Sequence, residues 1–245
     1  MDMYKAHSLS RIHADWSCLV SQSFRLHEPG FRAEVFQFAS RIMGRAKVLL
    51  EEIIDNLLTE GYRFVEPNKV HQAPDSDLWD WIREYEEGGI YLPVSLQAWL
   101  AVVGNVDLRG THPSWPKPGY VFDEMPATSD VLYTDPLVVD VSGDYVAYLR
   151  REWETNIRDE GSENVGPFLV AISPDHIHKA NVSGGPPYEV PAQTPAVDSL
   201  LYNERHCTSF TDYIRIALRW GGFPGLEYSP DKEDVTKGIS RGISI

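Results

Sequence analysis

The sequence has few cysteines and no long apolar run. Its two cysteines, Cys18 and Cys207, lie far apart, which argues against a disulfide framework and favours a reducing cytoplasm. No stretch approaches the roughly 18 apolar residues that a membrane span requires. The N-terminal residues 1–16 also lack the apolar core of a secretory signal. We therefore expect a soluble, cytoplasmic protein that makes no membrane contact.

Basic residues are also scarce, because 22 Lys and Arg stand against 36 Asp and Glu, for a net charge of −14. The imbalance is concentrated in residues 51–90, where eleven acidic residues accompany three basic ones. A chain this acidic is repelled by phosphate backbones, so we expect no nucleic-acid partner. A basic protein is the natural electrostatic partner, although surplus acid is also a common way to keep a protein soluble.

Common catalytic and cofactor-binding motifs are missing from the chain. The sequence contains no GxxxxGKS/T or GxGxxG phosphate-binding loop, no HExxH zinc motif and no GxSxG nucleophile turn. No spacing of acidic residues singles out a catalytic pair. We therefore expect no catalytic residues, no cofactor and no enzyme activity.

One stretch, residues 172–190, nevertheless looks like an active site. Two histidines one residue apart on a strand point to the same face, so His176 and His178 allow a metal pair. A metal site needs at least one further ligand, and the available candidates are Asp175, His206 and Cys207. The spacing matches no compact zinc signature, and we expect no bound metal. A metal-assisted hydrolase centred on these residues is the alternative function.

The same stretch is better explained by turn formation. Residues 178–190 are expected to form two strands joined at 183–185, where Gly184 and Gly185 supply the positive φ of a tight hairpin. The two prolines that follow lack the backbone donors that a phosphate-binding loop needs. The histidines and glycines are therefore predicted to have a structural role.

The longest predicted helix spans residues 31–60. Its apolar residues follow one another in steps of three and four, which places them in one stripe along a helix, and Gly61 ends the helix. We expect the stripe to pack on the rest of the domain. Self-association through it, as in a coiled coil, is the alternative. The stripe consists of Val35, Ala39, Ile42, Ala46, Leu49, Ile53 and Leu57.

The whole pattern predicts an α+β fold, a mostly antiparallel twisted sheet flanked by helices, with an extra N-terminal helical segment. Residues 1–74 are predicted to form a helical extension packed on the main domain, 75–225 the α+β domain, and 226–245 a polar tail. Further helices are expected within 74–89, 93–104, 142–161 and 208–222, strands within 62–67, 135–141, 167–173 and 198–204, and a proline-rich loop at 111–126.

Residues 91–108, YLPVSLQAWLAVVGNVDL, resemble the part of the SUKH (Smi/Knr-type) superfamily in which a Leu-Pro pair opens a helix that ends at glycine. Residues 135–140, 168–190 and 209–225 are similar, in the expected order, to the strand meander and closing helix of that superfamily. The resemblance covers roughly residues 75–225. The matching positions in the first segment are Leu92, Pro93, Leu96, Trp99, Leu100 and Gly104.

The resemblance implies an α+β fold without catalytic residues. Many bacterial members of the superfamily are immunity proteins, which bind and neutralise polymorphic toxins that are often basic, and fungal relatives act as regulatory scaffolds. Since a fold does not by itself determine a function, this remains a hypothesis. The favoured hypothesis is a non-catalytic protein-binding module that neutralises a basic toxin domain, and the oligomeric state stays open.

The predicted partner-binding surface lies on and just after the proline-rich loop 111–126. A rigid loop loses little entropy on binding, and aromatic side chains contribute strongly to protein recognition. The alternative is that Trp115 only covers the core, because large aromatic side chains are usually buried to a substantial extent. The predicted contact residues are Trp115, Tyr120, Asp123, Glu124, Tyr133 and Asp135.

Overall fold

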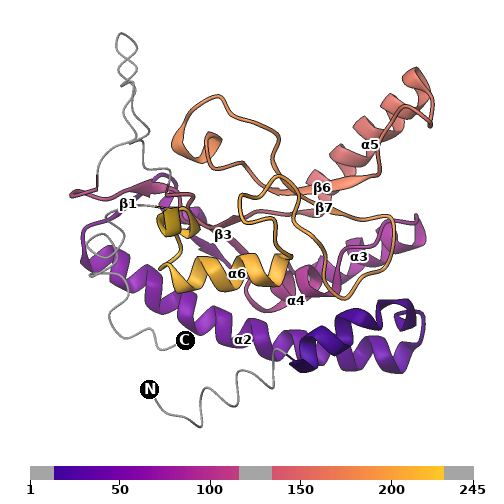
Figure 1. The fold of residues 1–245 in the computed structure, drawn as a ribbon, viewed down its shortest axis with the longest axis horizontal. Helices are drawn as coiled ribbons and strands as arrows, with labels where there is room; N and C mark the ends of the chain where they lie inside the picture. Colours follow the sequence, from indigo (N-terminus) through magenta and orange to yellow (C-terminus); the bar gives the residue numbers. More distant parts are fainter. Residues whose placement is uncertain (1–13, 116–133, 229–245) are drawn as a thin grey trace.

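The longest element is helix α2, Pro29–Thr59, in a computed structural model that describes residues 14–115 and 134–228 (Figure 1). Its apolar stripe packs against α4, Val94–Val102, and α6, Phe210–Arg219. Five predicted stripe residues are buried, while Ile42 and Leu49 are only partly covered and Met43 and Leu50 are buried instead. The buried side chains are Phe31, Val35, Ala39, Met43, Ala46, Leu50, Ile53 and Leu57.

The N-terminal segment joins the same hydrophobic core. Trp16 is buried, stacks on Phe38 of α2 at 6.1 Å, and its Nε1 donates a hydrogen bond of 3.2 Å to Thr211 of α6. The central helix α4 contacts both α2 and α6, and its Trp99 is fully buried with its ring edge against Phe210. The extension therefore contacts the main body of the protein through its core.

All described strand pairs are antiparallel, and the protein has an α+β fold. The three-stranded sheet contains β2, His71–Gln72, β3, Asn105–Asp107, and β5, Val138–Val139. Strand β6, Leu169–Ser173, pairs with β7, Tyr188–Pro191. A backbone hydrogen bond of 2.9 Å from Asp140 N to Ile172 O links these two sheets. A third pair joins β1, Arg63–Phe64, to β4, Gly110–Thr111.

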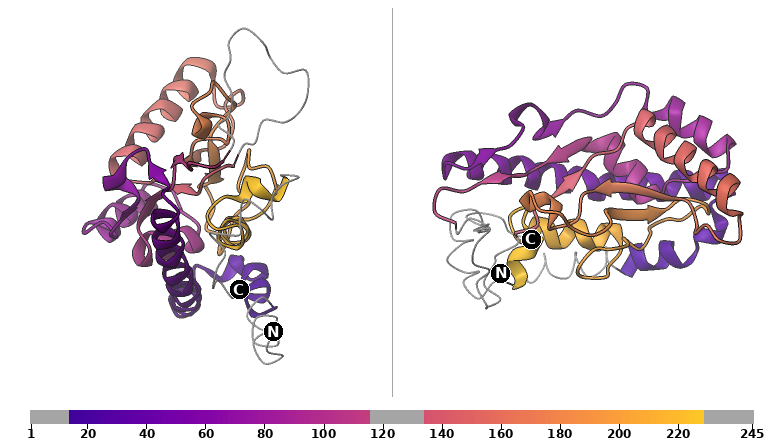
Figure 2. Two further views of the ribbon diagram at one scale, coloured as in Figure 1. Left: turned by 90° about the vertical axis from the view of Figure 1, so that its left-hand side faces the viewer. Right: turned by 90° about the horizontal axis from the view of Figure 1, so that it is seen from above.

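Two more helices lie against each other beside the strands. Helix α3, Leu78–Glu87, contacts α5, Gly143–Glu160, and the Tyr85 hydroxyl donates a hydrogen bond of 2.7 Å to the Gly143 carbonyl. Figures 1 and 2 show α5 on the opposite side of the strands from α2. Within residues 14–115 and 134–228, no helix combines the length and the apolar character needed to cross a membrane.

The predicted hairpin at 183–185 is wrong. Residues His178–Ala180 form the short 3-10 helix η3, and the whole segment 174–187 is a loop between β6 and β7. The left-handed residue of this loop is Asn181, with φ 62°, whereas neither Gly184 nor Gly185 has a positive φ. Hydrogen bonds within the loop and a buried lysine in η3 determine its path, and glycine spacing alone does not reveal such contacts.

Two other predicted strands are shorter than expected. The segment 198–204 makes only isolated bridges, Glu189 with Tyr202 and Leu200 with Ser209. The segment 135–141 forms a strand only at β5, and its first residue, Asp135, has a φ of 50°, which is incompatible with extended backbone. The short apolar runs therefore predicted where these strands lie, but they did not predict how long the strands are.

Candidate functional site

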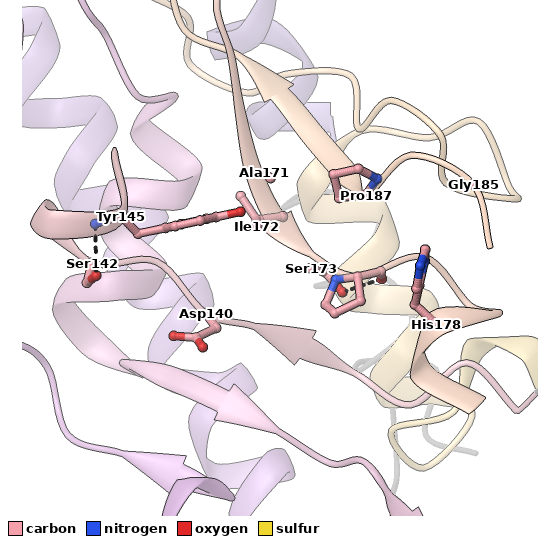
Figure 3. A pocket seen from close by; sticks show the side chains of 10 residues that line it. Asp140, Ser142, Tyr145, Ala171, Ile172, Ser173, His178, Gly185 and Pro187 are labelled. Atoms are coloured by element: carbon pink, nitrogen blue, oxygen red, sulfur yellow. Dashed lines mark hydrogen bonds between the residues drawn. The ribbon is translucent and has the colours of Figure 1, made fainter. Parts of the chain in front are cut away.

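An open cleft of about 490 Å3 lies between the end of β5, the first turn of α5, strand β6 and the loop 174–187 (Figure 3). Asp140 and Tyr145 line it on one side, and His178 lies on the loop at the other side. Ala171 and Ser173 of β6 also line it. The cleft thus brings together side chains from two stretches of the sequence, residues 140–145 and 171–187.

The start of α5 places Tyr145 at the cleft. The Ser142 hydroxyl accepts a hydrogen bond of 3.3 Å from Tyr145 N, which caps the helix where the chain leaves β5. Tyr145 extends toward Ile172 in Figure 3, and its side chain remains 38% exposed. Tyr148 follows one turn later, is also exposed, and stacks on Tyr145 with their ring centroids 6.5 Å apart.

Asp140 is the acidic residue on the β5 side of the cleft. Among the described residues its carboxylate accepts no hydrogen bond and forms no ion pair. Burial raises the pKa of Asp140, the charge of Lys69 opposes this, and Asp107 adds to it. Both nearby basic groups are already paired, Lys69 with Glu66 at 2.8 Å and Arg109 with Asp107 at 2.6 Å. Asp140 itself is an exposed residue, so its carboxylate is open to solvent at the edge of the cleft.

Glu189 of β7 adds a second carboxylate near Tyr145. It is partly buried, and burial raises its pKa, although a hydrogen bond of 3.2 Å from Asn203 Nδ2 opposes the shift. Partial burial also raises the pKa of the Tyr145 hydroxyl, and the charges of Glu189 and Asp140 raise it further. Asp140 and the exposed ring of Tyr145 therefore share this side of the cleft, and Glu189 lies on the neighbouring strand, opposite the lining residue Ala171.

The opposite side is built by an Asp–His pair in the loop 174–187. Asp175 accepts hydrogen bonds from Ile177 N at 2.8 Å, from His178 N at 3.3 Å and from the His178 ring at Nδ1. Burial acts to raise the pKa of Asp175, but these hydrogen bonds outweigh it and lower the pKa. The other ring nitrogen of His178 accepts a hydrogen bond of 3.4 Å from Gly184 N. Both ring nitrogens of His178 therefore contribute to the shape of the loop.

The residues of the hydrolase alternative are only partly brought together. Asp175 and His178 are in contact, but His176 lies in a turn before η3, so the predicted strand geometry of the histidine pair is wrong. Cys207 belongs to a separate turn, has a φ of 52°, and follows His206, which contacts Glu204. Across the two described ranges, no three His, Cys, Asp or Glu side chains are placed to hold one metal ion.

The structure places the predicted partner-binding residues in different environments. Trp115 is partly buried, with its ring edge against Phe223 at 4.8 Å and its face stacked on His112 at 4.7 Å, so it does cover the core. Asp135 is only 1% exposed, and its predicted role in a surface contact is therefore wrong. Tyr120, Asp123, Glu124 and Tyr133 lie outside the described residues, and their role stays a prediction.

Asp135 instead holds the loop 174–187 to the core. Its carboxylate accepts hydrogen bonds from Lys179 Nζ at 2.7 Å and from the Tyr188 hydroxyl at 3.0 Å. Lys179 is fully buried, its Nζ lies 4.4 Å from the centre of the Tyr188 ring, and burial lowers its pKa against the pull of Asp135. The sequence provides no sign of this ion pair, because a lysine in a polar turn is normally exposed.

Sequence reasoning also missed Asp140, Tyr145 and Glu189. One indication was present, since Tyr145 and Tyr148 lie off the side of the helix that carries Val146 and Trp153, and that position favours exposure. Their proximity to Glu189 depends on the folding of β7 beside α5, for which no local pattern exists.

The whole chain was also compared with known proteins. No family model matches it, and no curated protein and no solved structure matches it either.

Proposed function

We propose that the chain is a non-catalytic protein-binding module of the cytoplasm, an immunity protein of the SUKH type that binds and neutralises a basic toxin domain. The observation that carries the proposal is the cleft, which the exposed Tyr145 lines together with the carboxylate of Asp140, and beside which the exposed Tyr148 stacks on Tyr145. The net charge of −14 supports the same class of partner.

Physical chemistry favours this surface for protein recognition. Tyrosine is enriched among residues that dominate binding energy, because it combines a large apolar ring with a hydroxyl and few rotatable bonds. Carboxylates around such residues steer a basic partner into place and repel acidic ones. The Asp175–His178 pair serves the loop beside the cleft, which supports a structural role for the stretch that first looked catalytic.

Co-expression with a toxin tests the proposal. The resemblance leads us to expect a toxin gene beside the gene of this chain, and that toxin's basic domain is the partner to use. Bacterial cells that produce both proteins are expected to grow, and the purified pair is expected to form a stoichiometric complex. Cell death despite normal levels of the folded chain, together with no complex in gel filtration, would overturn the proposal.

A matched pair of variants locates the surface. Tyr148→Ala is expected to weaken the complex by about tenfold, because loss of a contacting aromatic side chain typically costs more than 1 kcal/mol. Phe24→Ala removes another exposed aromatic ring, which is 75% exposed, distant from the cleft in sequence and not among the residues that line it, and the change is expected to leave affinity unchanged. Equal affinities for both variants would place the toxin elsewhere on the protein.

A further inference from the structure

Strand β6 has one edge that pairs with β7 and a second edge that turns away from it. In an antiparallel pair, residues that exchange backbone hydrogen bonds alternate with residues whose main-chain groups face outward. Ala192 N donates a hydrogen bond of 3.2 Å to Phe168 O, so the alternation along the ladder turns the N–H and C=O of Ala171 away from β7. Its cross-strand neighbour Glu189 shows the same alternation, because its main chain bonds to Tyr202 on the outer side of β7.

The outward groups of Ala171 face the place where β5 and β6 separate. Within the described residues, one backbone hydrogen bond of 2.9 Å, from Asp140 N to Ile172 O, connects the two segments. None of the described residues provides a hydrogen bond to the N–H or the C=O of Ala171 on this side. The chain then enters α5 at Gly143, and the cleft opens between the start of this helix and β6.

These main-chain groups belong to a buried residue that lines the cleft. Ala171 is only 4% exposed. The great majority of buried backbone donors and acceptors in proteins are paired, because an unpaired one costs about as much as a lost hydrogen bond. The cleft has a volume of about 490 Å3, within the range of roughly 300 to 1,000 Å3 that is typical of ligand pockets. A short peptide can therefore enter and supply the partners.

The walls of the cleft favour a polypeptide backbone as the occupant. Pro174 and Pro187 line the cleft and have no N–H groups to compete for an acceptor, and the ring of Tyr145 extends toward β6 (Figure 3). The edge of β6 offers a donor and an acceptor on the same residue, which is the pattern that an extended strand matches. A second copy of the chain is a poor occupant, because its own β6 edge is equally recessed and each copy carries a net charge of −14.

We propose that an extended segment of the partner protein enters this cleft as an added strand, with its main chain bonded to the N–H and C=O of Ala171. The inference rests on the proposed function, because the segment belongs to the toxin domain, and it names the mode of recognition. Main-chain hydrogen bonds provide affinity in strand addition, while side chains of the added strand provide specificity. Asp140 at the edge of the cleft favours a basic residue in the segment.

A short peptide tests this site without the toxin. The probe is acetyl-Lys-Val-Thr-Val-Lys-amide, titrated into the full chain while NMR follows the exchange of backbone amides with deuterium. The exchange of Ala171 is expected to slow by about tenfold at saturation, because a new hydrogen bond protects this amide. Val170 faces β7 in the ladder, and its exchange is expected to stay unchanged.

Two results of this titration would overturn the proposal. The first is an Ala171 amide that exchanges as fast at saturation as in the free chain. The second is an Ala171 amide that is already as protected in the free chain as that of Val170, because another part of the same chain would then occupy the edge.

Methylation of the peptide nitrogens separates strand addition from general charge attraction. An extended peptide carries its N–H groups on two edges, at alternate residues. Methylation of the second and fourth residues blocks one edge only and is expected to change affinity less than about threefold. Methylation of all five residues blocks both edges at unchanged charge and is expected to weaken binding by about tenfold or more. Equal affinities of the three peptides would show that the lysines alone attract the probe and would refute strand addition.

Variants of the chain test the same contact from the other side. Ala171→Pro removes the outward N–H and keeps the bonds between β6 and β7, a position where a strand tolerates proline, and it is expected to weaken peptide binding by about tenfold. Gly185→Phe adds a ring at a residue that lines the cleft, where a Cβ meets no atom within 4 Å, and a similar loss is expected. Gly30→Phe, at an equally open glycine in α2, is the control and is expected to change binding less than about twofold. Equal affinities of the Gly185 and Gly30 variants would contradict the site, even if the proline variant fails to fold.

The toxin complex distinguishes failure of this inference from failure of the proposed function. If the complex forms equally well with the Gly185→Phe protein and the unaltered chain, strand addition is wrong while the proposed function stands. If the unaltered chain forms no complex, the proposed function itself is overturned. A loss of about tenfold or more in toxin affinity, with the fold intact by circular dichroism, supports both.

Discussion

Two neighbouring glycines of the loop 174–187 have opposite surroundings. A Cβ at Gly184 would collide with the carboxylate of Asp175, whereas a Cβ at Gly185 would meet no atom within 4 Å. The Asp175 carboxylate has little freedom to move, because it accepts hydrogen bonds from Ile177 N and from His178. Gly184 is therefore needed for a close approach and not for a positive φ.

Alanine at these two positions is expected to have different effects on stability. Gly184→Ala should lower the free energy of unfolding by about 1 to 3 kcal/mol, as overpacking of a well-ordered site does. Gly185→Ala should leave it within about 0.5 kcal/mol of the original value. Urea unfolding followed by circular dichroism measures both. A similar loss in the two variants would mean that Asp175 is not held as the structure shows.

Helix α2 is the element whose role the structure clarifies most. Its stripe faces α4 and α6 of the same chain, so those side chains are already used in the core. Leu50 on the stripe is fully buried, whereas Val48 is 54% exposed. The coiled-coil alternative required the stripe to be available to a second chain, and the structure contradicts this.

Truncation of these two residues tests the assignment of the stripe to the core. Leu50→Ala is expected to lower the free energy of unfolding by about 2 to 5 kcal/mol through lost burial and the cavity left behind. Val48→Ala is expected to change it by less than about 0.5 kcal/mol. Urea unfolding at two protein concentrations gives the measurement. A midpoint that rises with concentration would show that α2 also joins copies of the chain.

Helix α5 shows how one element serves both core and surface. Val146 is buried, and Trp153 packs its ring edge on Phe168 at 5.6 Å, which anchors one side of the helix. Tyr145 and Tyr148 lie on another side and stay exposed. The same helical periodicity that buries the first pair thus presents the second pair beside the cleft.

At the scale of the whole molecule, the surplus of acid should govern the speed of binding. The association rate with a basic toxin domain is expected to fall by about tenfold or more as salt rises, while the dissociation rate changes less. Stopped-flow mixing at several salt concentrations measures both rates. An association rate independent of salt would show that the charge of −14 serves solubility alone.

Two double variants then decide which acidic surface steers the partner. Asp140→Asn with Glu189→Gln removes one carboxylate that lines the cleft and one on the neighbouring strand β7, and Asp123→Asn with Glu124→Gln removes those of the loop predicted from the sequence. The electrostatic potential of a charge acts over roughly one Debye length. Removal of the carboxylates that lie nearer to the bound toxin should therefore slow association more. A larger effect of the Asp123 and Glu124 pair would move the binding surface to that loop.

The sequence by itself determined the α+β class and the position of the main helices. Apolar residues in steps of three and four positions predicted α2, and the helix expected within 208–222 is α6, whose first turn is capped where the Ser209 hydroxyl accepts a hydrogen bond of 3.4 Å from Asp212 N. Gly61, Gly161 and Gly221 have positive φ where helices were expected to end. These features depend on contacts between residues a few positions apart, so they are visible in a local pattern.

Only the tertiary structure decided the site. Lys179 is 44 positions from Asp135, and the burial of this ion pair shapes the loop 174–187, which sequence spacing had suggested to be a hairpin. Glu189 likewise lies near Tyr145 only because β7 folds beside α5. A side chain's burial, charge and neighbours arise from long-range packing, and a pattern of period two or 3.6 describes only the residue's own element.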